Sequence, residues 1–169
     1  QRYAFKNADT YEFMLAVEDA TGRNLPWFFD QWAYKAGHPK VQVSSVWSDD
    51  TRMLQLEFTQ TQVLDSLTGV FKFPLSIECT TSAETTVVSV FIDQQQQKVS
   101  IPLSEQPLMV VLDKGKSVLA TFDLERTEEE YLYQMSHAGD IVDRIAAAKE
   151  LQQYNSDTAV VGAVRNAAL

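Results

Sequence analysis

Leu25-Pro-Trp-Phe-Phe-Asp-Gln-Trp-Ala-Tyr-Lys-Ala-Gly-His-Pro39 is the stretch of sequence that decides the fold. Pro26 stands at a first-turn position, where its missing N–H costs nothing, and Gly37 followed by Pro39 is typical of the end of a helix. These residues are therefore expected to form a helix that is too aromatic to be exposed on all sides. From Val41 onward apolar residues alternate with polar ones, which indicates that a β-rich half follows directly.

An amphipathic helix is also predicted upstream, from Asp9 to Thr21. Asp9 fits an N-cap with Glu12 three residues on, and Gly22 fits the stop. The apolar residues that recur at helical spacing are Phe13, Met14, Val17 and Ala20. The N-terminal part is thus expected to be a pair of helices.

Six or seven short strands are predicted after the helical pair. They cover residues 41–46, 53–58, 71–79, 86–93, 97–103 and 107–113, with Val118-Leu119 as a possible seventh. Pro74 cannot donate to a ladder, so its strand is expected at an edge or a bulge. Gln94–Gln97 reads most simply as a polar hairpin loop. Strands at such regular spacing predict an antiparallel β-sandwich.

Helical patterning returns at Thr127, which together with Glu130 forms a capping-box pattern. Gly139 then breaks the chain, Asp140 is the expected cap of the next helix, and residues 155–157 mark a break before a third helix. Three short helices, each with one apolar face, predict the start of a helical repeat. The predicted fold class is therefore α+β, mainly β: an antiparallel β-sandwich flanked by an N-terminal helical pair and by C-terminal helices that begin an α-helical repeat.

Composition narrows the classes of partner. The chain has 169 residues, and 14 Lys and Arg against 23 Asp and Glu give a net charge of −9, which repels nucleic acids and anionic lipids. No apolar run approaches the roughly 20 residues of a membrane span. Neither a nucleic acid nor a membrane is expected as a partner. The lone Cys79 excludes an internal disulfide and a multi-cysteine zinc site. A single Cys is compatible with the cytoplasm or the periplasm, so the compartment stays open, with the cytoplasm slightly favoured.

The termini indicate a fragment of a longer chain. Gln1 is not an initiator Met, and residues 165–169 stop inside what reads as a helix. The sequence is therefore expected to be a piece whose neighbouring parts lie outside it.

No catalytic, cofactor-binding or metal-ligating residue is predicted. His38 and His137 are far apart in the sequence, without a second His at the spacing that places two imidazoles on one metal. The carboxylates of Asp49-Asp50 and of Glu128–Glu130 are expected at an exposed turn and at a helix N-terminus. An acidic hydrolase acting alone is a possibility that rests only on these scattered carboxylates.

The aromatic side chains of the decisive stretch allow two interpretations. They could form a carbohydrate platform or a peptide groove, or they could anchor the helix against a neighbouring layer. Their helical spacing favours core packing. The residues are Trp27, Phe28, Phe29, Trp32 and Tyr34.

The order of these motifs closely resembles the aminopeptidase N family of zinc metallopeptidases. The resemblance is carried by Thr10–Phe13, Thr21-Gly22, Leu25, Phe28-Phe29, Trp32, Gly37, Pro39, Leu54–Gln60, Phe71–Leu75 and Ala138–Arg144. In that family a thermolysin-like catalytic domain leads into a β-sandwich and then into an α-helical repeat domain. The resemblance implies that residues 1–39 are the C-terminal helices of the catalytic domain. Residues 40–122 would be the β-sandwich domain, and residues 123–169 the first helices of the repeat domain.

The resemblance also implies a role without chemistry. The chain lacks an H-E-x-x-H helix, a downstream glutamate ligand and a G-A-M-E-N-like substrate loop, so no catalytic or metal residue is carried over. The expected function is that of a non-catalytic fragment of a zinc-dependent aminopeptidase, which positions the helical domain over the active site. Zinc and the peptide substrate are expected in the parent enzyme only, and the fragment is expected to pack against the missing catalytic and helical domains.

An alternative stays open. The chain could be a stand-alone or scaffold protein-interaction module that has an aminopeptidase-like architecture and no peptidase activity. An aminopeptidase-like subunit of the general transcription machinery is a relative of this kind.

Overall fold

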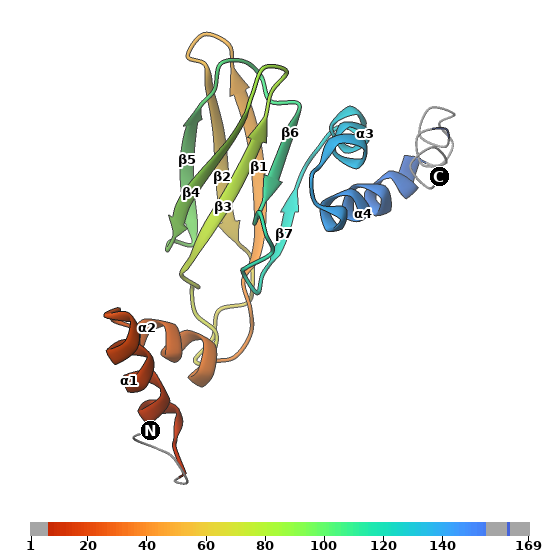
Figure 1. Cartoon of the computed structure of the whole chain (residues 1–169). Coiled ribbons are helices and arrows are strands. Elements are labelled where there is room, and N and C mark those ends of the chain that lie inside the picture. Colours follow the sequence, from red (N-terminus) through yellow and green to blue (C-terminus); the bar gives the residue numbers. More distant parts are fainter. Residues whose placement is uncertain (1–6, 155–161, 163–169) are drawn as a thin grey trace.

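The computed structural model of the chain describes residues 7–154 and Gly162. The helices are α1 (Thr10–Thr21), α2 (Pro26–Phe29), α3 (Glu128–His137) and α4 (Ile141–Glu150), with a π-helical turn at Asp30–Tyr34 and a 3-10 turn at Leu151–Tyr154. The strands are β1 (Lys40–Ser48), β2 (Met53–Gln60), β3 (Phe73–Thr80), β4 (Thr85–Ile92), β5 (Gln96–Pro102), β6 (Met109–Leu112) and β7 (Thr121–Leu124). α1 and α2 lie at one end of the sandwich, and α3 and α4 lie on the side of β7 (Figure 1). The fold is α+β and mainly β, as predicted.

The two sheets have the strand orders β5-β2-β1-β7 and β4-β3-β6. Neighbouring strands are antiparallel, as predicted, except that β7 pairs parallel to β1, with Phe122 opposite Val41. The prediction of a seventh strand at Val118-Leu119 is wrong. The Asp113 carboxylate accepts hydrogen bonds from the N–H groups of Ser117 and Val118, which holds that segment in a loop. The strand therefore begins only at Thr121.

The interior between the sheets is apolar because alternate side chains of the strands point into it. The buried core consists of Val41, Val43, Leu54, Leu56, Phe58, Phe71, Phe73, Leu75, Ile77, Cys79, Ile92, Ile101, Leu103, Val110, Leu112 and Leu124. Trp32 and Trp47 pack against this core from its margin. The core thus joins both sheets and contacts the aromatic helix, which consists of α2 and the π-helical turn after it.

Two local predictions within the strands are wrong. β3 is the central strand of its sheet, although Pro74 predicted an edge or a bulge. β6 pairs only with Ile77–Thr80 of β3. At Pro74, β3 therefore has β4 as its only neighbour, and the missing N–H of the proline costs no hydrogen bond of the ladder. The segment after β4 is also not a hairpin, because β5 pairs with β2 in the other sheet. Gln97 instead binds back to the end of β4 through the carbonyl of Phe91, at 2.8 Å.

The N-terminal helices begin and end largely as predicted. Asp9 and Glu12 form the reciprocal capping box of α1, and Gly22 closes the helix in the left-handed region at φ 67°. The second helix ends earlier than expected, because Lys35 is already extended after the π-helical turn. Gly37 therefore lies in the connection to β1 and not in the last helical turn.

The C-terminal helices also follow their caps. Thr127 and Glu130 form the predicted capping box of α3, and Asp140 caps α4 by accepting from the N–H of Val142. α3, α4 and the following 3-10 turn share a small buried cluster of Tyr131, Met135, Ala147 and Leu151. The third predicted helix, with Val160, Val161 and Val164, lies outside the described residues. In the part of the chain that the structure describes, no helix is long and apolar enough to span a membrane.

Candidate functional site

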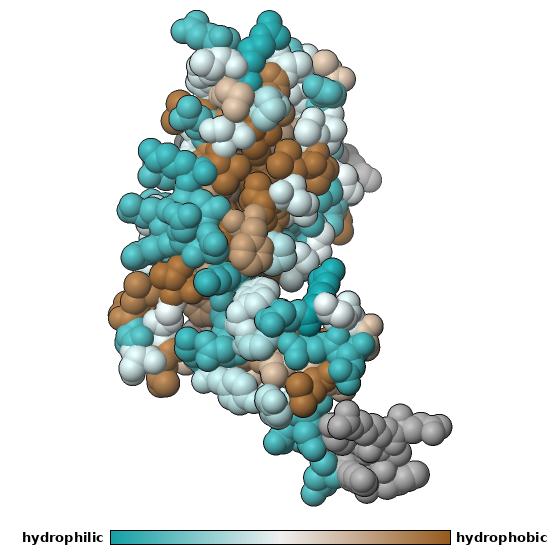
Figure 2. Space-filling view, turned by 90° about the vertical axis from the view of Figure 1, so that its left-hand side faces the viewer, coloured by the Kyte–Doolittle hydropathy of each residue, from teal (hydrophilic) through white to brown (hydrophobic). Residues whose placement is uncertain are grey.

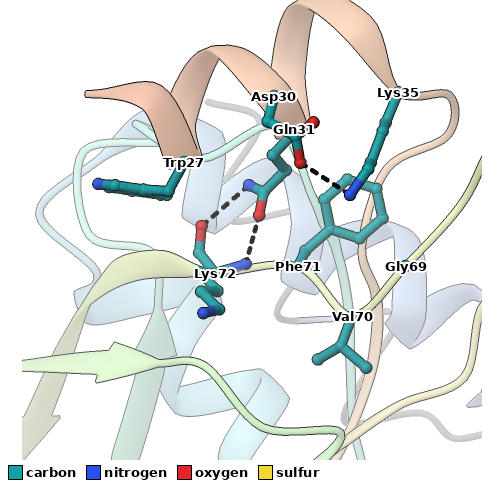
Figure 3. Close-up of a pocket in the computed structure, with 8 residues that line it drawn as sticks. All are labelled: Trp27, Asp30, Gln31, Lys35, Gly69, Val70, Phe71 and Lys72. Atoms are coloured by element: carbon teal, nitrogen blue, oxygen red, sulfur yellow. Dashed lines mark hydrogen bonds and ion pairs between the residues drawn. The ribbon is translucent and has the colours of Figure 1, made fainter.

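A cavity of about 200 Å³ lies where the aromatic helix meets the sandwich. One wall comes from the helix and the other from the segment that leads into β3 (Figure 3). The lining residues are Trp27, Asp30, Gln31, Lys35, Gly69, Val70, Phe71 and Lys72. The position of this cavity marks the first junction between a helical part and the sandwich.

Gln31 joins the two walls of this junction through its side-chain amide. Its Nε2 donates to the carbonyl oxygen of Lys72 at 2.9 Å, and its Oε1 accepts from the N–H of Lys72 at 2.6 Å (Figure 3). Gln31 is only 8% exposed, although it lies in the first turn after α2. The amide thus pairs with the main chain as a neighbouring strand would.

Gln60 binds the same segment from the opposite side. It is 1% exposed, its Nε2 donates to the Phe71 carbonyl at 2.8 Å, and its Oε1 accepts from the Phe71 N–H at 2.9 Å. Gln62 extends this network by donating to Gln60 and by accepting from the N–H of Lys40, the first residue of β1. The main chain at residues 71–72 precedes β3, so these side chains satisfy polar groups that no strand reaches.

Aromatic packing closes the junction beside the glutamine network. The rings of Trp32 and Phe71 lie 5.4 Å apart, and Phe71 is 2% exposed. Phe29 is buried as well, whereas Phe28 is 42% and Tyr34 59% exposed. Core packing therefore accounts for Trp32 and Phe29, as predicted, but two of the aromatic side chains remain largely at the surface.

The loop after Gln62 contacts the chain at the C-terminal end of the aromatic helix. The Asp65 carboxylate accepts from the N–H groups of Leu67 and Thr68, and these bonds lower the pKa of Asp65. The Leu67 carbonyl in turn accepts from the N–H of Ala36 at 3.0 Å. Gly37 has φ +87°, and a Cβ at this position would lie 3.1 Å from Cγ2 of Thr68. The close approach requires glycine.

A second junction ties the C-terminal helices to the sandwich. Lys116 Nζ, in the loop after β6, lies 2.7 Å from Oδ1 of Asp143 on α4, and Asp143 is 2% exposed. Lys114 pairs with Glu78 of β3 at 2.8 Å, and the hydrogen bond that Lys114 donates to the Glu78 carboxylate raises the pKa of Lys114. A small apolar cluster of Met109, Val111 and Ala138 joins β6 to the end of α3.

The second junction also contains buried polar atoms without a protein hydrogen-bond partner. They are Oδ2 of Asp143, Oε1 of Gln134 and Nε of Arg126, and their residues line a cavity of about 360 Å³. The Nε2 of Gln134 donates to the Asp143 carbonyl at 2.9 Å, which fixes α3 against the start of α4. This junction is therefore more polar than the first.

The candidate chemical residues of the sequence do not meet in one place. His38 lies in the connection before β1, and His137 lies at the C-terminus of α3, stacked 4.1 Å from the ring of Tyr133. Asp49 is in the turn after β1 and accepts from Nε1 of Trp47 at 2.7 Å. Within residues 7–154, no group of three or more His, Cys, Asp and Glu side chains could hold a metal ion.

Cys79 lies in the core and is not placed for chemistry. It is fully buried, and burial together with the neighbouring charge of Glu78 raises its pKa to about 11. The reactive thiolate is therefore disfavoured at neutral pH.

The glutamines of the first junction are not among the residues that the sequence pattern predicts as functional. One signal could have revealed Gln60, because it continues the inward alternation of Leu54, Leu56 and Phe58 on β2. No comparable signal marks Gln31, whose partner lies 41 residues away in the sequence.

The sandwich with its two junctions has an aminopeptidase-like architecture. A crystal structure of Legionella pneumophila aminopeptidase A in complex with aspartic acid matches it with a TM-score of 0.69. The sequence identity is 18%, and the match covers 84% of this chain and 16% of that chain.

The sequence itself is similar to transcription initiation factor TFIID subunit 2 of Drosophila melanogaster. The two are 25% identical over an alignment of 171 positions that covers 84% of this chain. The chain spans 14% of the length of that relative. No protein-family model matches the chain.

Proposed function

We propose that this chain is a non-catalytic connector within a longer protein of aminopeptidase-like architecture. In this role the β-sandwich holds the helices before it and the helices after it in fixed positions. The parent we favour is a scaffold protein akin to TFIID subunit 2, which is the alternative that the sequence analysis left open.

The observation that carries the connector role is the pairing of residues 71–72 by two glutamine side chains. Gln31 from the helix and Gln60 from the sheet bind adjacent main-chain positions, with bonds of 2.6 to 2.9 Å. Bonds to main chain fix direction as well as distance, and each lost bond would free a main-chain N–H or C=O group at the junction. Such a junction suits a rigid attachment better than a hinge.

The second junction supports the same role on the other side of the sandwich. The ion pair of Lys116 with the buried Asp143 joins the loop after β6 to α4. Only Asp143 of this pair is buried, so removing the Lys116 amine would leave a buried carboxylate without its counter-charge, which is destabilising. Both helical parts are thus held by specific polar contacts in addition to apolar packing.

The choice of parent rests on the sequence relative. An identity of 25% across 84% of the chain favours a protein akin to TFIID subunit 2. In that setting the connector would support protein contacts of a transcription-initiation assembly, and residues 1–39 and 123–169 would continue into neighbouring helical parts.

A zinc aminopeptidase is the second candidate parent, favoured by the fold shared with the Legionella enzyme. In that case zinc and the peptide substrate would belong to the catalytic domain outside this chain. The connector would then hold a helical domain over the active site.

The product of the whole reading frame, purified with an affinity tag from its own cells, tests the proposal. Mass spectrometry of the proteins that co-purify shows whether other TFIID subunits are among them. Zinc content and hydrolysis of alanine or leucine anilides are measured on the same sample. The variant Gln31→Leu and the control Gln55→Leu, at an exposed position on β2, are purified in parallel.

Stable association with TFIID subunits, without stoichiometric zinc or anilide hydrolysis, would support the scaffold parent. Zinc and hydrolysis without that association would support the peptidase instead. The connector role predicts that Gln31→Leu weakens whichever activity is found, while Gln55→Leu leaves it unchanged. Equal behaviour of the two variants would refute the role assigned to the first junction.

A further inference from the structure

The cavity of about 360 Å³ at the second junction combines apolar walls with buried polar atoms that have no partner among the described residues. Its apolar walls include Val118, Phe122, Leu124 and Ala146. On the side turned away from α3 and α4, Figure 2 shows hydrophobic side chains gathered over the sandwich. Apolar contact alone selects no particular ligand chemistry, because it is non-directional. Apolar walls with a few convergent polar groups are typical of ligand sites of this volume.

The side chains that carry the unpartnered atoms are linked by a chain of contacts around β6. Nε2 of Gln134 donates to the main-chain carbonyl of Asp143 at 2.9 Å. Oδ1 of Asp143 lies 2.7 Å from Nζ of Lys116, which also donates to the last carbonyl of β6 at 3.2 Å. Arg126 donates to the carbonyl of Val110 in the same strand at 2.9 Å. Gln134, Asp143 and Arg126 therefore meet at the one cavity that they line.

The unpartnered atoms are two acceptors and one donor. The acceptors are Oδ2 of Asp143 and Oε1 of Gln134, whose residues are 2% and 3% exposed, and the donor is Nε of Arg126. A buried polar atom without a partner is destabilising. A ligand that pairs with all three atoms thus gains free energy that other ligands do not.

We propose that this cavity binds a primary carboxamide. One N–H of the ligand donates to Asp143, the other donates to Gln134, and the ligand carbonyl accepts from Arg126. The side chain of a glutamine or asparagine in a partner protein carries this group, and so does a small amide. This inference goes beyond the proposed function and does not depend on it.

The charges that line the cavity favour a neutral ligand. Lys116 and Arg126 contribute two positive charges, and Asp113 and Asp143 contribute two negative ones. An ammonium group has donors only and would leave Nε of Arg126 unpaired. A carboxylate has acceptors only, so it would leave both unpartnered oxygens unpaired and would face the charge of Asp143. The carboxamide supplies both kinds of group without adding charge.

Binding requires a small movement of one wall, because the three unpartnered atoms have almost no solvent-exposed surface. The loop between β6 and β7 forms that wall, and its residues Gly115–Ser117 are exposed. Gly115 and Lys116 both have positive φ, 88° and 51°. An exposed loop opens more readily than the strands beside it, so this loop is the wall that moves to admit the ligand.

An NMR titration of the ¹⁵N-labelled 169-residue chain tests the site with benzamide, benzoate and benzylammonium, which are similar in size and differ in the polar group. Benzamide should give saturable shifts confined to the residues that line the cavity. The other two probes should bind at least about tenfold more weakly, since each leaves buried atoms unpaired.

A fourth probe, N-acetylglutamine N-methylamide, carries its primary amide on the side chain only and distinguishes the two sources of the ligand. Tighter binding of this probe than of benzamide would support a partner-protein side chain as the ligand. Weaker but saturable binding would support a small aromatic amide.

Two variants test the position of the ligand. Asp143→Asn replaces an acceptor and should weaken benzamide binding about tenfold, but it also breaks the ion pair with Lys116. Ala146→Leu leaves the ion pair intact and fills the cavity from an exposed position of α4, so it should weaken binding of every amide. Its matched control is Ala16→Leu, at an exposed position of α1, which should bind benzamide as the wild type does.

Three results would overturn the proposal. The first is binding of benzoate or benzylammonium as tight as that of benzamide. The second is an Ala146→Leu variant that binds benzamide as Ala16→Leu does. The third is the absence of saturable shifts at the cavity with every amide tested.

Discussion

Replacing Gln31 by Leu is expected to loosen the attachment of the aromatic helix without changing the size of the side chain greatly. The substitution removes two hydrogen bonds to Lys72, of 2.9 and 2.6 Å. A net contribution of about 1 kcal/mol per bond predicts a loss of about 2 kcal/mol in the free energy of unfolding. The loss should not be much larger, because the junction borders a cavity through which water can reach the freed groups.

Urea unfolding measures the global effect, and hydrogen exchange of the Lys72 amide measures the local one. A loss of about 2 kcal/mol corresponds to exchange roughly 30-fold faster at this amide if local opening carries the exchange. The control Gln55→Leu, on the exposed face of β2, should alter neither quantity. Unchanged exchange of the Lys72 amide in Gln31→Leu would refute the reasoning, because the amide would then not depend on the glutamine.

The remaining predictions concern Gly37, Lys114 and Cys79. Gly37→Ala should destabilise the chain by about 1–2 kcal/mol in urea unfolding, because φ is +87° and the new Cβ would lie 3.1 Å from Thr68; an unchanged midpoint would contradict this strain. The pKa of Lys114 is raised by Glu78, so the stabilisation by this pair should be present at neutral pH and lost as the pH rises past 10.5, and the urea midpoints of wild type and Lys114→Met should differ at neutral pH and converge as the pH rises past that value. Cys79, with its pKa raised to about 11, should react with a thiol reagent at pH 8 no faster than the chain opens, and rapid labelling of the folded chain would contradict its burial.

Much of the local structure could be predicted because its signals are local. Asp9 with Glu12, and Thr127 with Glu130, form capping boxes in the structure as they do in the sequence pattern. The alternation of β1 and β2 around a tight turn likewise specifies a hairpin. These signals depend on neighbours a few residues apart, whose geometry the chain sets by itself.

The candidate site was less accessible, because its residue types are ambiguous. Glutamine is usually exposed, and Gln31 and Gln60 are buried only because a segment distant in the sequence, residues 71–72, lies between them. Aromatic residues at helical spacing correctly indicated packing for Trp32, but the same pattern did not distinguish it from the exposed Tyr34. Burial of a particular side chain depends on what lies opposite it.

The sequence alone thus determined where the described helices begin, and that the fold is mainly β. Only the tertiary structure decided that β5 crosses to the sheet of β2, that β7 runs parallel to β1, and that Pro74 lies in a central strand. Alternation specifies which face of a strand is buried, but it says nothing about which strand lies beside it. That choice depends on contacts between residues far apart in the chain, where many pairings satisfy the same pattern and the packing of the whole core selects one.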